Sequence, residues 1–132
     1  MKLNFRPKAA FASQKAFNYL SDKHPSDINQ IVVIRHAAIG DFMNIRPFLL
    51  GLKSFFPNAK ITLSTINTYA YGTPDDLIDA IHIIDRTVNG KKTSAFQRLK
   101  QIKQLPKVDL LFDLTDSSLS LLTAIFSKPK LK

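Results

Sequence analysis

Residues 31–41, with the sequence IVVIRHAAIGD, decide the fold of this chain. They begin with four consecutive β-branched residues, an apolar run too short for a buried helix and typical of a strand covered on both faces. The run ends in small residues and reaches Gly40, which can adopt backbone angles that a side chain would forbid. Asp41 follows immediately, before a segment over 42–56 whose apolar residues have helical spacing. The pattern predicts a strand, a tight loop and a helix, with a carboxylate where strand and helix meet.

This junction is also where a ligand is expected. Open α/β sheets bind ligands at the carboxyl ends of their strands, and a helix amino terminus there offers free N–H groups to an anion. His36 belongs to the same loop, where a histidine either packs or takes part in a site. Asp41 is either a general base or simply a helix cap, and the residues alone leave both open. The small residues that would let a phosphate or sugar approach the backbone are Ala37, Ala38, Ile39 and Gly40.

The rest of the chain alternates between strands and helices. The TPDD sequence at 73–76 predicts a helix start, because a threonine cap, a proline and first-turn acids occur together there. The resulting βαβαβαβα order predicts a Rossmann-like α/β fold, an open parallel sheet with right-handed crossovers and helices on both faces. The other predicted elements are strands over 60–66, 81–85 and 108–114 and helices over 94–105 and 117–126, the last capped by Asp116 or Ser117.

Three details of these elements can be checked in a structure. Pro47 either lies in the first turn of the helix over 42–56 or kinks that helix. The Asn89-Gly90 dipeptide predicts a turn. In the helix over 94–105, we expect Phe96, Leu99, Ile102 and Leu105 to face inward and Arg98, Lys100 and Lys103 to face outward.

Length and hydropathy indicate one domain. We place a Rossmann-like domain at 31–132 of the 132 residues, after a basic extension at 1–30. Within the extension, residues 9–20 favour a helix that either packs against the domain edge or lies on a membrane surface. No segment approaches the roughly 18 apolar residues of a membrane span, and the amino terminus lacks the apolar core of a signal peptide. We therefore expect a cytoplasmic protein.

The charge pattern restricts the chemistry. The chain carries a net charge of +9, has no cysteine, and all ten of its acidic residues are aspartate. Disulfides and cysteine nucleophiles are therefore excluded, and carboxylate catalysis must use an aspartate. Residues 86–107 include seven basic residues and no acid, either as a solvated face or as a surface for an anionic partner. Because Phe96 is the only aromatic ring in that region, we expect no nucleic-acid partner.

Four segments, in order along the chain, carry a resemblance to a known family. They are Ile34-Arg35 with AIGD at 38–41, PFLLGLK at 47–53, FPNAKITL at 56–63 and VDLLFDL at 108–114. Over about 31–132 the sequence resembles the amino-terminal domain of glycosyltransferase family 9, the bacterial ADP-heptose:lipopolysaccharide heptosyltransferases. The resemblance implies the acceptor-side half of a GT-B enzyme with two facing Rossmann-like domains. The carboxyl-terminal, donor-binding domain is absent from this sequence, so we expect the chain to be inactive alone.

The resemblance also implies roles for individual residues. Asp41 would be the general base of an inverting heptose transfer from ADP-heptose to the lipopolysaccharide core or a lipid A–Kdo acceptor. Family members usually show Asp-x-Gln-Gly at the acceptor cleft, where this chain has Asp113, Thr115 and Asp116. Arg46 lies near the same crevice, where an arginine suits acceptor carboxylates or phosphates.

The expected surroundings follow from the same resemblance. Beyond the nucleotide sugar, held mainly by the missing domain, we expect no cofactor and no metal. The acceptor implies contact with the inner face of the cytoplasmic membrane. The alternative function is a non-catalytic Rossmann-like module that binds an anionic partner or a membrane surface.

Overall fold

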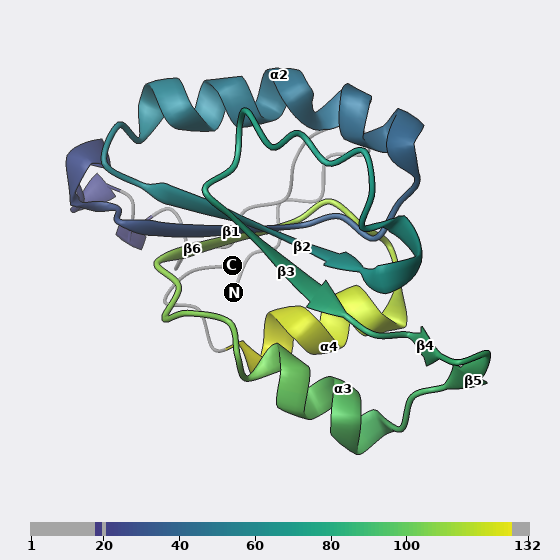
Figure 1. The fold of residues 1–132 in the computed structure, drawn as a ribbon. Coiled ribbons are helices and arrows are strands. Elements are labelled where there is room, and N and C mark those ends of the chain that lie inside the picture. The colour runs from purple at the N-terminus through teal and green to yellow at the C-terminus, as the bar shows by residue number, and fades with distance from the viewer. Residues whose placement is uncertain (1–17, 20, 128–132) are drawn as a thin grey trace.

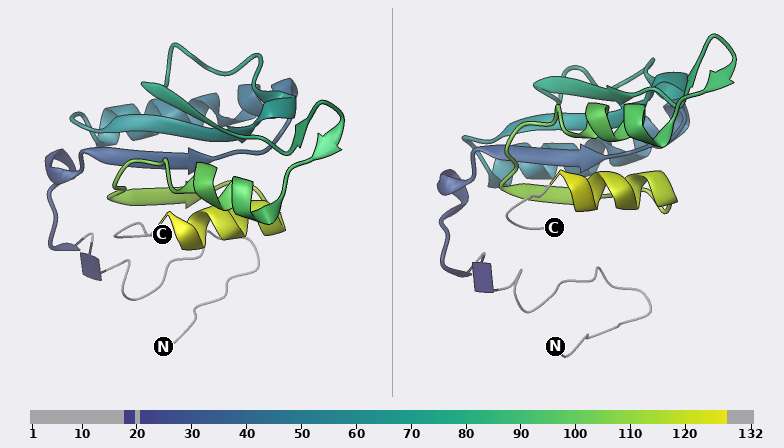
Figure 2. Two further views of the ribbon diagram at one scale, coloured as in Figure 1. Left: turned by 60° about the horizontal axis from the view of Figure 1, so that its bottom comes forward. Right: turned by 90° about the horizontal axis from the view of Figure 1, so that it is seen from below.

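The computed structural model describes residues 18–19 and 21–127, which form a parallel sheet between two layers of helices. The sheet has four strands in the order β3-β2-β1-β6. They are β1 (Gln30–Ile34), β2 (Lys60–Ile66), β3 (Ala80–Ile84) and β6 (Leu110–Asp113). Figure 1 shows α2 (Ile39–Phe55) on one face and α3 (Ala95–Ile102) with α4 (Ser118–Phe126) on the other, and Figure 2 shows the same layers from two further sides. The predicted Rossmann-like α/β fold is confirmed.

The central strand β1 carries the core on both of its faces. Its residues Ile31 and Val33 pack with Phe42 and Leu49 on the α2 side, whereas Val32 and Ile34 pack on the α4 side. These four side chains are all 0% exposed. Burying each such side chain contributes roughly 1.5–3 kcal/mol, so this short run supplies much of the stability of the sheet.

The crossover from β2 to β3 differs from the prediction. No helix starts at 73–76; the chain forms only the short 3₁₀ turn Asn67–Tyr69 and a hydrogen-bonded turn in which the Leu77 N–H donates to the Pro74 carbonyl (2.8 Å). The reason lies at Asp79, whose carboxylate and backbone N–H both bond to Ile61 at 2.8 Å. Because Asp79 is already fixed beside β2, too few residues remain after Pro74 for a helix.

Two local predictions are confirmed, and one of the two alternatives for Pro47 is excluded. Asn89 and Gly90 form the turn of a small hairpin, β4 (Thr87–Val88) with β5 (Lys91–Lys92), and both have positive φ (49° and 74°). The N-cap of α4 is Ser117, whose side chain accepts from the Ser120 N–H. Pro47 lies inside α2 rather than in its first turn.

Helix α3 (Ala95–Ile102) has Leu99 and Ile102 inward and Lys100 exposed, as predicted, but two other residues differ from the prediction. Its buried residue is Ile102, and Arg98, Leu99 and Gln101 are half-buried beside it. Phe96 lies off this face and is 77% exposed, so its predicted inward position is wrong, as is the outward position of half-buried Arg98. The helix ends at Ile102, before the predicted end at 105.

The amino-terminal extension is described only in part. Of the helix predicted over 9–20, Asn18 and Tyr19 are described and are helical; the rest lies outside the described residues. Tyr19 packs against the core on the α2 side, and Ile28 is 1% exposed within that core.

Candidate functional site

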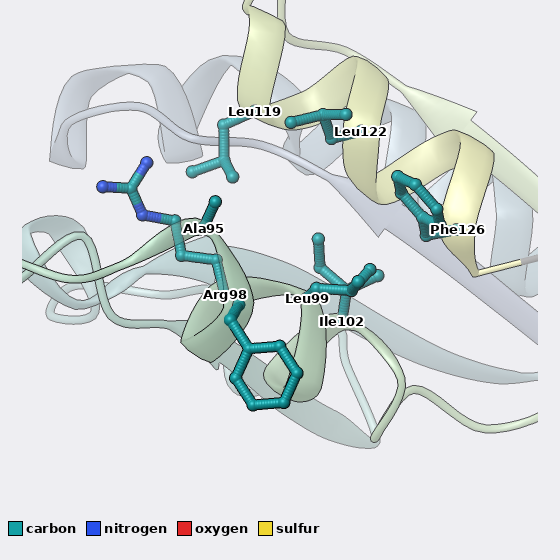
Figure 3. Close-up of a pocket in the computed structure, with 8 residues that line it drawn as sticks. Ala95, Arg98, Leu99, Ile102, Leu119, Leu122 and Phe126 are labelled. Atoms are coloured by element: carbon teal, nitrogen blue, oxygen red, sulfur yellow. The ribbon is translucent and has the colours of Figure 1, made fainter.

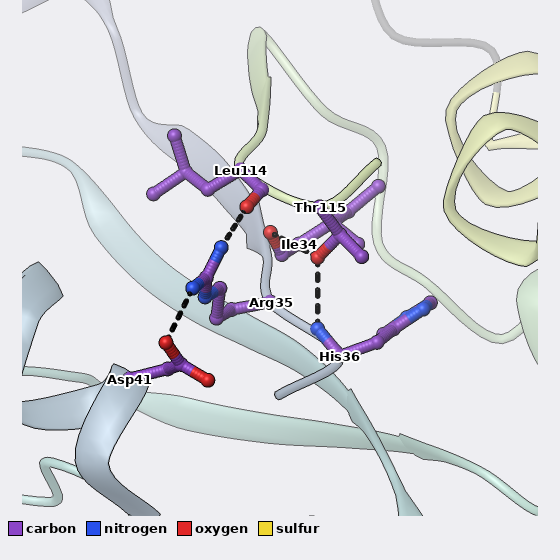
Figure 4. Close-up of polar contacts among 6 residues, drawn as sticks. All are labelled: Ile34, Arg35, His36, Asp41, Leu114 and Thr115. Carbon is purple, nitrogen blue, oxygen red and sulfur yellow. Dashed lines mark hydrogen bonds and ion pairs between the residues drawn. The ribbon is translucent and has the colours of Figure 1, made fainter. Parts of the chain in front are cut away.

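Arg35 and His36 continue the chain directly beyond β1, at the carboxyl edge of the sheet. The Arg35 N–H donates to the carbonyl of Ser64 at 2.9 Å. The His36 N–H donates to Oγ1 of Thr115, also at 2.9 Å. Both residues thus stay in line with the strand, where successive side chains point to opposite sides. Figure 4 shows Arg35 extending toward Asp41 and His36 pointing away from it, so two different groups of residues flank the end of β1.

Asp41 lies in the first turn of α2 and forms an ion pair with Arg35. Its Oδ1 lies 2.9 Å from one Arg35 nitrogen, while another nitrogen of the same guanidinium donates to the Leu114 carbonyl (Figure 4). The N-cap of α2 is Ala38, without a side-chain cap bond, so Asp41 does not cap the helix and that alternative is wrong. The Asp41 side chain is 41% exposed, and its Oδ2 bonds to no described residue. Arg35 therefore positions a carboxylate that keeps one oxygen available.

The loop before α2 is not the predicted tight glycine turn. Gly40 lies inside the first turn of α2 and has no positive φ, so the unusual backbone angles expected of it are not adopted. A Cβ at Gly40 would meet nothing within 4 Å. Ala38 and Ile39 are exposed beside it, and Ala37 is half-buried. The Ile39 and Gly40 N–H groups precede the first bond of this helix, in which the Asp41 N–H donates to the Ala38 carbonyl at 2.9 Å. Such first-turn N–H groups suit a ligand with acceptor oxygens.

The end of β6 lies at the same edge of the sheet. Asp113 is exposed, and its Oδ1 accepts from the Thr115 N–H at 2.9 Å. Thr115 also joins the segment after β6 to β1, because its hydroxyl accepts from the His36 N–H and donates to the Ile34 carbonyl. Asp116 is exposed. The structure thus brings Asp113 and Thr115 beside the exit of β1, as their order in the chain predicted.

Arg46 is the one candidate with a different environment. Both of its terminal nitrogens bond to the carboxylate of Asp76, at 2.8 and 2.5 Å, and the guanidinium lowers the pKa of that carboxyl below its ordinary value. This pair ties α2 to the loop before β3. Arg46 has no contact with Asp41 and is already paired with an acid of its own chain.

His36 and His82 are both half-buried histidines, and their rings differ in hydrogen bonding among the described residues. His82 bonds through Nδ1 to the Ser64 hydroxyl and through Nε2 to the Gln101 carbonyl, each at 2.9 Å. Both ring nitrogens of His36 are buried with no hydrogen-bond partner among the described residues. Burial, with smaller contributions from His82 and Arg86, lowers the pKa of His36 from 6.5 to about 4. His36 is therefore a neutral imidazole at neutral pH.

A larger hollow lies between α3 and α4. It has a volume of about 410 Å³ and is lined on one side by Leu99 and Ile102 and on the other by Leu122 and Phe126 (Figure 3). Its lining is almost wholly apolar, apart from Arg98 at one end. A sugar needs hydrogen-bonding groups on most sides, so this groove does not suit one.

Two arginines that the sequence treated only as part of a basic run also reach this edge. Arg86 follows β3, Arg98 lies on α3, and both line a small cavity together with His36. Arg98 carried a recognisable signal, since it is four residues from buried Ile102 and therefore on the buried face of its helix. Arg86 carried none, because its position depends on the hairpin that follows it.

Neither a metal cluster nor a membrane-spanning helix is found in the part of the chain that the structure describes. Within residues 18–19 and 21–127, no three His or Asp side chains gather in a way that could hold a metal ion. The helices within these residues are also too short or too polar to cross a bilayer.

The chain is similar in fold to a solved glycosyltransferase structure. That structure is described as "The crystal structure of the glycosyl transferase family 9 from Veillonella parvula DSM 2008", and it superposes with a TM-score of 0.62 at 21% identity over 76% of this chain. The chain spans 30% of the length of that protein. No family model matches the chain, and no curated protein matches it either. At this identity the likeness establishes the fold class, a Rossmann-like α/β domain of the kind found in that transferase.

Proposed function

We propose that this chain is the acceptor-side domain of an inverting glycosyltransferase, in which Asp41 is the general base. One observation carries the proposal: Asp41, at the carboxyl edge of the central strand, is held by Arg35 through one oxygen, and its other oxygen has no partner among the described residues. The likeness of the fold to the Veillonella glycosyl transferase family 9 structure supports it. The open backbone at Gly40 gives a substrate access to that carboxylate.

The reaction would be a single displacement. Oδ2 of Asp41 accepts the proton of an acceptor hydroxyl as its oxygen attacks the anomeric carbon of the donor sugar. The new C–O bond forms as the bond from the anomeric carbon to the diphosphate breaks, and the nucleoside diphosphate leaves with the bonding electron pair. Arg35 keeps the carboxylate in place for this transfer, and a positioned base of this kind contributes roughly 10²–10⁴-fold in rate.

The substrates belong to the same proposal. ADP-heptose would be the donor, bound mainly by a second domain, and the lipopolysaccharide core or lipid A–Kdo would be the acceptor. Asp113, Thr115 and Asp116 would line the acceptor cleft, with Ala37, Ala38 and Ile39 beside it. The protein would then work in the cytoplasm, in peripheral contact with the inner membrane, and this chain alone would not transfer sugar.

The first experiment is the intact mass of the native polypeptide from its own cells, followed by a transfer assay on that polypeptide. The assay would follow addition of heptose from ADP-heptose to a lipid A–Kdo acceptor by mass spectrometry. We expect Asp41→Asn to lower kcat by about 10²–10⁴-fold. The matched control is Asp22→Asn, which removes an exposed carboxylate outside the site and should leave kcat unchanged. Transfer by Asp41→Asn at the wild-type rate would show that Asp41 is not the base.

The alternative is a non-catalytic module that binds an anionic surface. The observation in its favour is the acid-free segment over 86–107, with its seven basic residues and the 77% exposed Phe96. Sedimentation with vesicles containing anionic lipid at physiological salt tests it, with neutral vesicles as the control. Retention of the chain together with a native polypeptide that lacks transfer would favour the binding module over the enzyme.

A further inference from the structure

A small cavity lies on the side of β1 opposite to Asp41. It has a volume of about 150 Å³, and its lining comes from five separate parts of the chain, one of them the end of β2 at Ile66. His36 follows β1, Arg86 follows β3, Arg98 lies on α3, and the start of α4 completes the wall. The remaining lining residues are Ile66, Ser117, Ser118 and Leu119. All of these segments meet at the carboxyl edge of the sheet, where open α/β folds bind ligands.

The lining is cationic and contains no acid. Neither Arg86 nor Arg98 forms an ion pair with any acid within residues 18–19 and 21–127. Arg98 is held in place by Thr93, whose Oγ1 accepts from its Nε at 2.9 Å and whose carbonyl accepts from its Nη2 at 2.7 Å. The backbone of Arg86 is also fixed, by Asn67 at 3.1 Å and by the Thr93 N–H at 3.1 Å. The Arg98 guanidinium is therefore held in place at the cavity, and Arg86 adds an exposed side chain on a fixed backbone. Neither has a counter-ion among the described residues.

The amino terminus of α4 adds neutral donors to the same wall. The helix has nine residues, and its N-cap Ser117 already satisfies the N–H of Ser120. The N–H groups of Ser118 and Leu119 precede the first intrahelical bond, which joins the Leu121 N–H to the Ser117 carbonyl at 3.0 Å. Such first-turn N–H groups and the positive end of the helix dipole favour an anion.

The ring of His36 is an independent indication that this cavity is a ligand site. Buried polar atoms nearly always have a hydrogen-bond partner, and the other half-buried histidine, His82, has one for each ring nitrogen. Both ring nitrogens of His36 have none among the described residues, although the ring lines the cavity. An acceptor oxygen in the cavity would provide a partner and would also reduce the charge repulsion from Arg86 that disfavours protonation of His36.

We propose that this cavity binds a single phosphate group, of a phosphomonoester, through Arg86, Arg98, His36 and the first N–H groups of α4. Arginine suits this ligand because its planar fork matches the oxygens of phosphate. The volume is below the roughly 300 Å³ at which pockets for drug-sized molecules begin, so the cavity takes one tetrahedral group rather than a nucleotide. The phosphate is carried either by a small soluble molecule or by a lipid. This inference goes beyond sugar transfer and does not depend on it.

The test measures binding directly in this chain, by NMR titration with inorganic phosphate and with glycerol 3-phosphate. The chain has three histidines, so the ring signals of His36 can be assigned and followed. We expect saturable shifts of His36 and of the amides of Ser118 and Leu119. Arg86→Gln and Arg98→Gln should each raise Kd at least tenfold. The control is Lys92→Gln, which removes one charge from the exposed hairpin outside the cavity and should change Kd less than twofold.

Sedimentation with vesicles that contain phosphatidic acid distinguishes the two sources of phosphate. Retention that glycerol 3-phosphate reverses and Arg86→Gln abolishes supports the pocket and identifies a lipid phosphate as its ligand. Binding of soluble phosphomonoester without vesicle retention supports the pocket and identifies a soluble ligand. The proposal is overturned if neither probe shifts His36, or if Lys92→Gln weakens binding as much as the two arginine variants, which would indicate unspecific attraction. None of these readouts involves sugar transfer, so failure here leaves the role of Asp41 unaffected.

Discussion

The stability of this domain should fall in mild acid because His36 is buried as a neutral ring. Its pKa is about 4 in the folded chain and 6.5 when unperturbed, so the unfolded chain takes up the proton first as the pH falls. The stabilisation is complete above pH 6.5 and is lost progressively down to pH 4. Each pH unit in this window lowers the free energy of unfolding by about 1.4 kcal/mol. At pH 4.5 the decrease due to His36 is therefore about 2 kcal/mol, after allowance for the partial exposure of the ring.

The measurement is urea unfolding at pH 7.5 and pH 4.5, compared between the wild type and His36→Gln. The variant keeps a polar side chain but cannot titrate, so its free energy of unfolding should fall by about 2 kcal/mol less between the two pH values. The groups that act on the ring are Arg86 and His82, both of which disfavour its protonation. The pKa of His82 is itself lowered by burial, so His82→Gln serves as a comparison with the same sign. An equal pH dependence in the wild type and His36→Gln would refute the reasoning.

Three further predictions concern the fold. Leu49→Ala should lower the free energy of unfolding by about 2–5 kcal/mol, because this side chain of α2 is fully buried against the sheet. Leu50→Ala, at its 55% exposed neighbour, should have little effect in the same urea titration. Asp109→Asn should cost about 1–3 kcal/mol, because its carboxylate accepts two backbone N–H groups at the start of β1, at 3.0 and 3.1 Å; unfolding of this variant at neutral pH tests it. Gly90→Ala should lower the midpoint of thermal unfolding, because φ is +74° at this position and a side chain is strained there. Gly51→Ala inside α2 should raise the midpoint in the same measurement, because a helix favours alanine over glycine and a Cβ meets nothing there.

The sequence predicted the elements whose signals are local. The β-branched run of β1 and the alternating residues of β2 predicted both strands closely, and Ser117 was one of two predicted caps for α4. The helix predicted to start at 73–76 does not form. Its signals are also local, whereas the conformation of this segment depends on the bonds of Asp79 to Ile61 of β2. Helix propensity is a weak guide where tertiary contacts fix both ends of a segment.

The candidate site was predicted in its position but not in its contacts. The carboxyl edge and Asp41 follow from the alternation of strands and helices. The bonds from Arg35 to Asp41 and Leu114 do not, because they depend on which loops the sheet order places side by side. The same holds for His36, whose neighbours Arg86 and Arg98 are brought to it by β3 and α3 rather than by spacing in the chain. The buried face of α3 was predictable only in part. The spacing of Leu99 and Ile102 indicates this face, but Phe96 was predicted to lie on it and is exposed.

The pairing of β1 also has a consequence for how the protein is made. On one side β1 pairs with β2, which follows soon after it, but on the other side it pairs with β6, and the bonded residues Gln30 and Asp109 are 79 residues apart. During synthesis, the Ile31–Ile34 edge therefore emerges from the ribosome long before its second partner exists. An unpaired, uncharged edge of β-branched residues readily pairs with other chains. Until residue 113 has been synthesised, the central strand of the finished domain therefore has one edge without its native partner, and a chaperone that covers this edge would prevent such pairing.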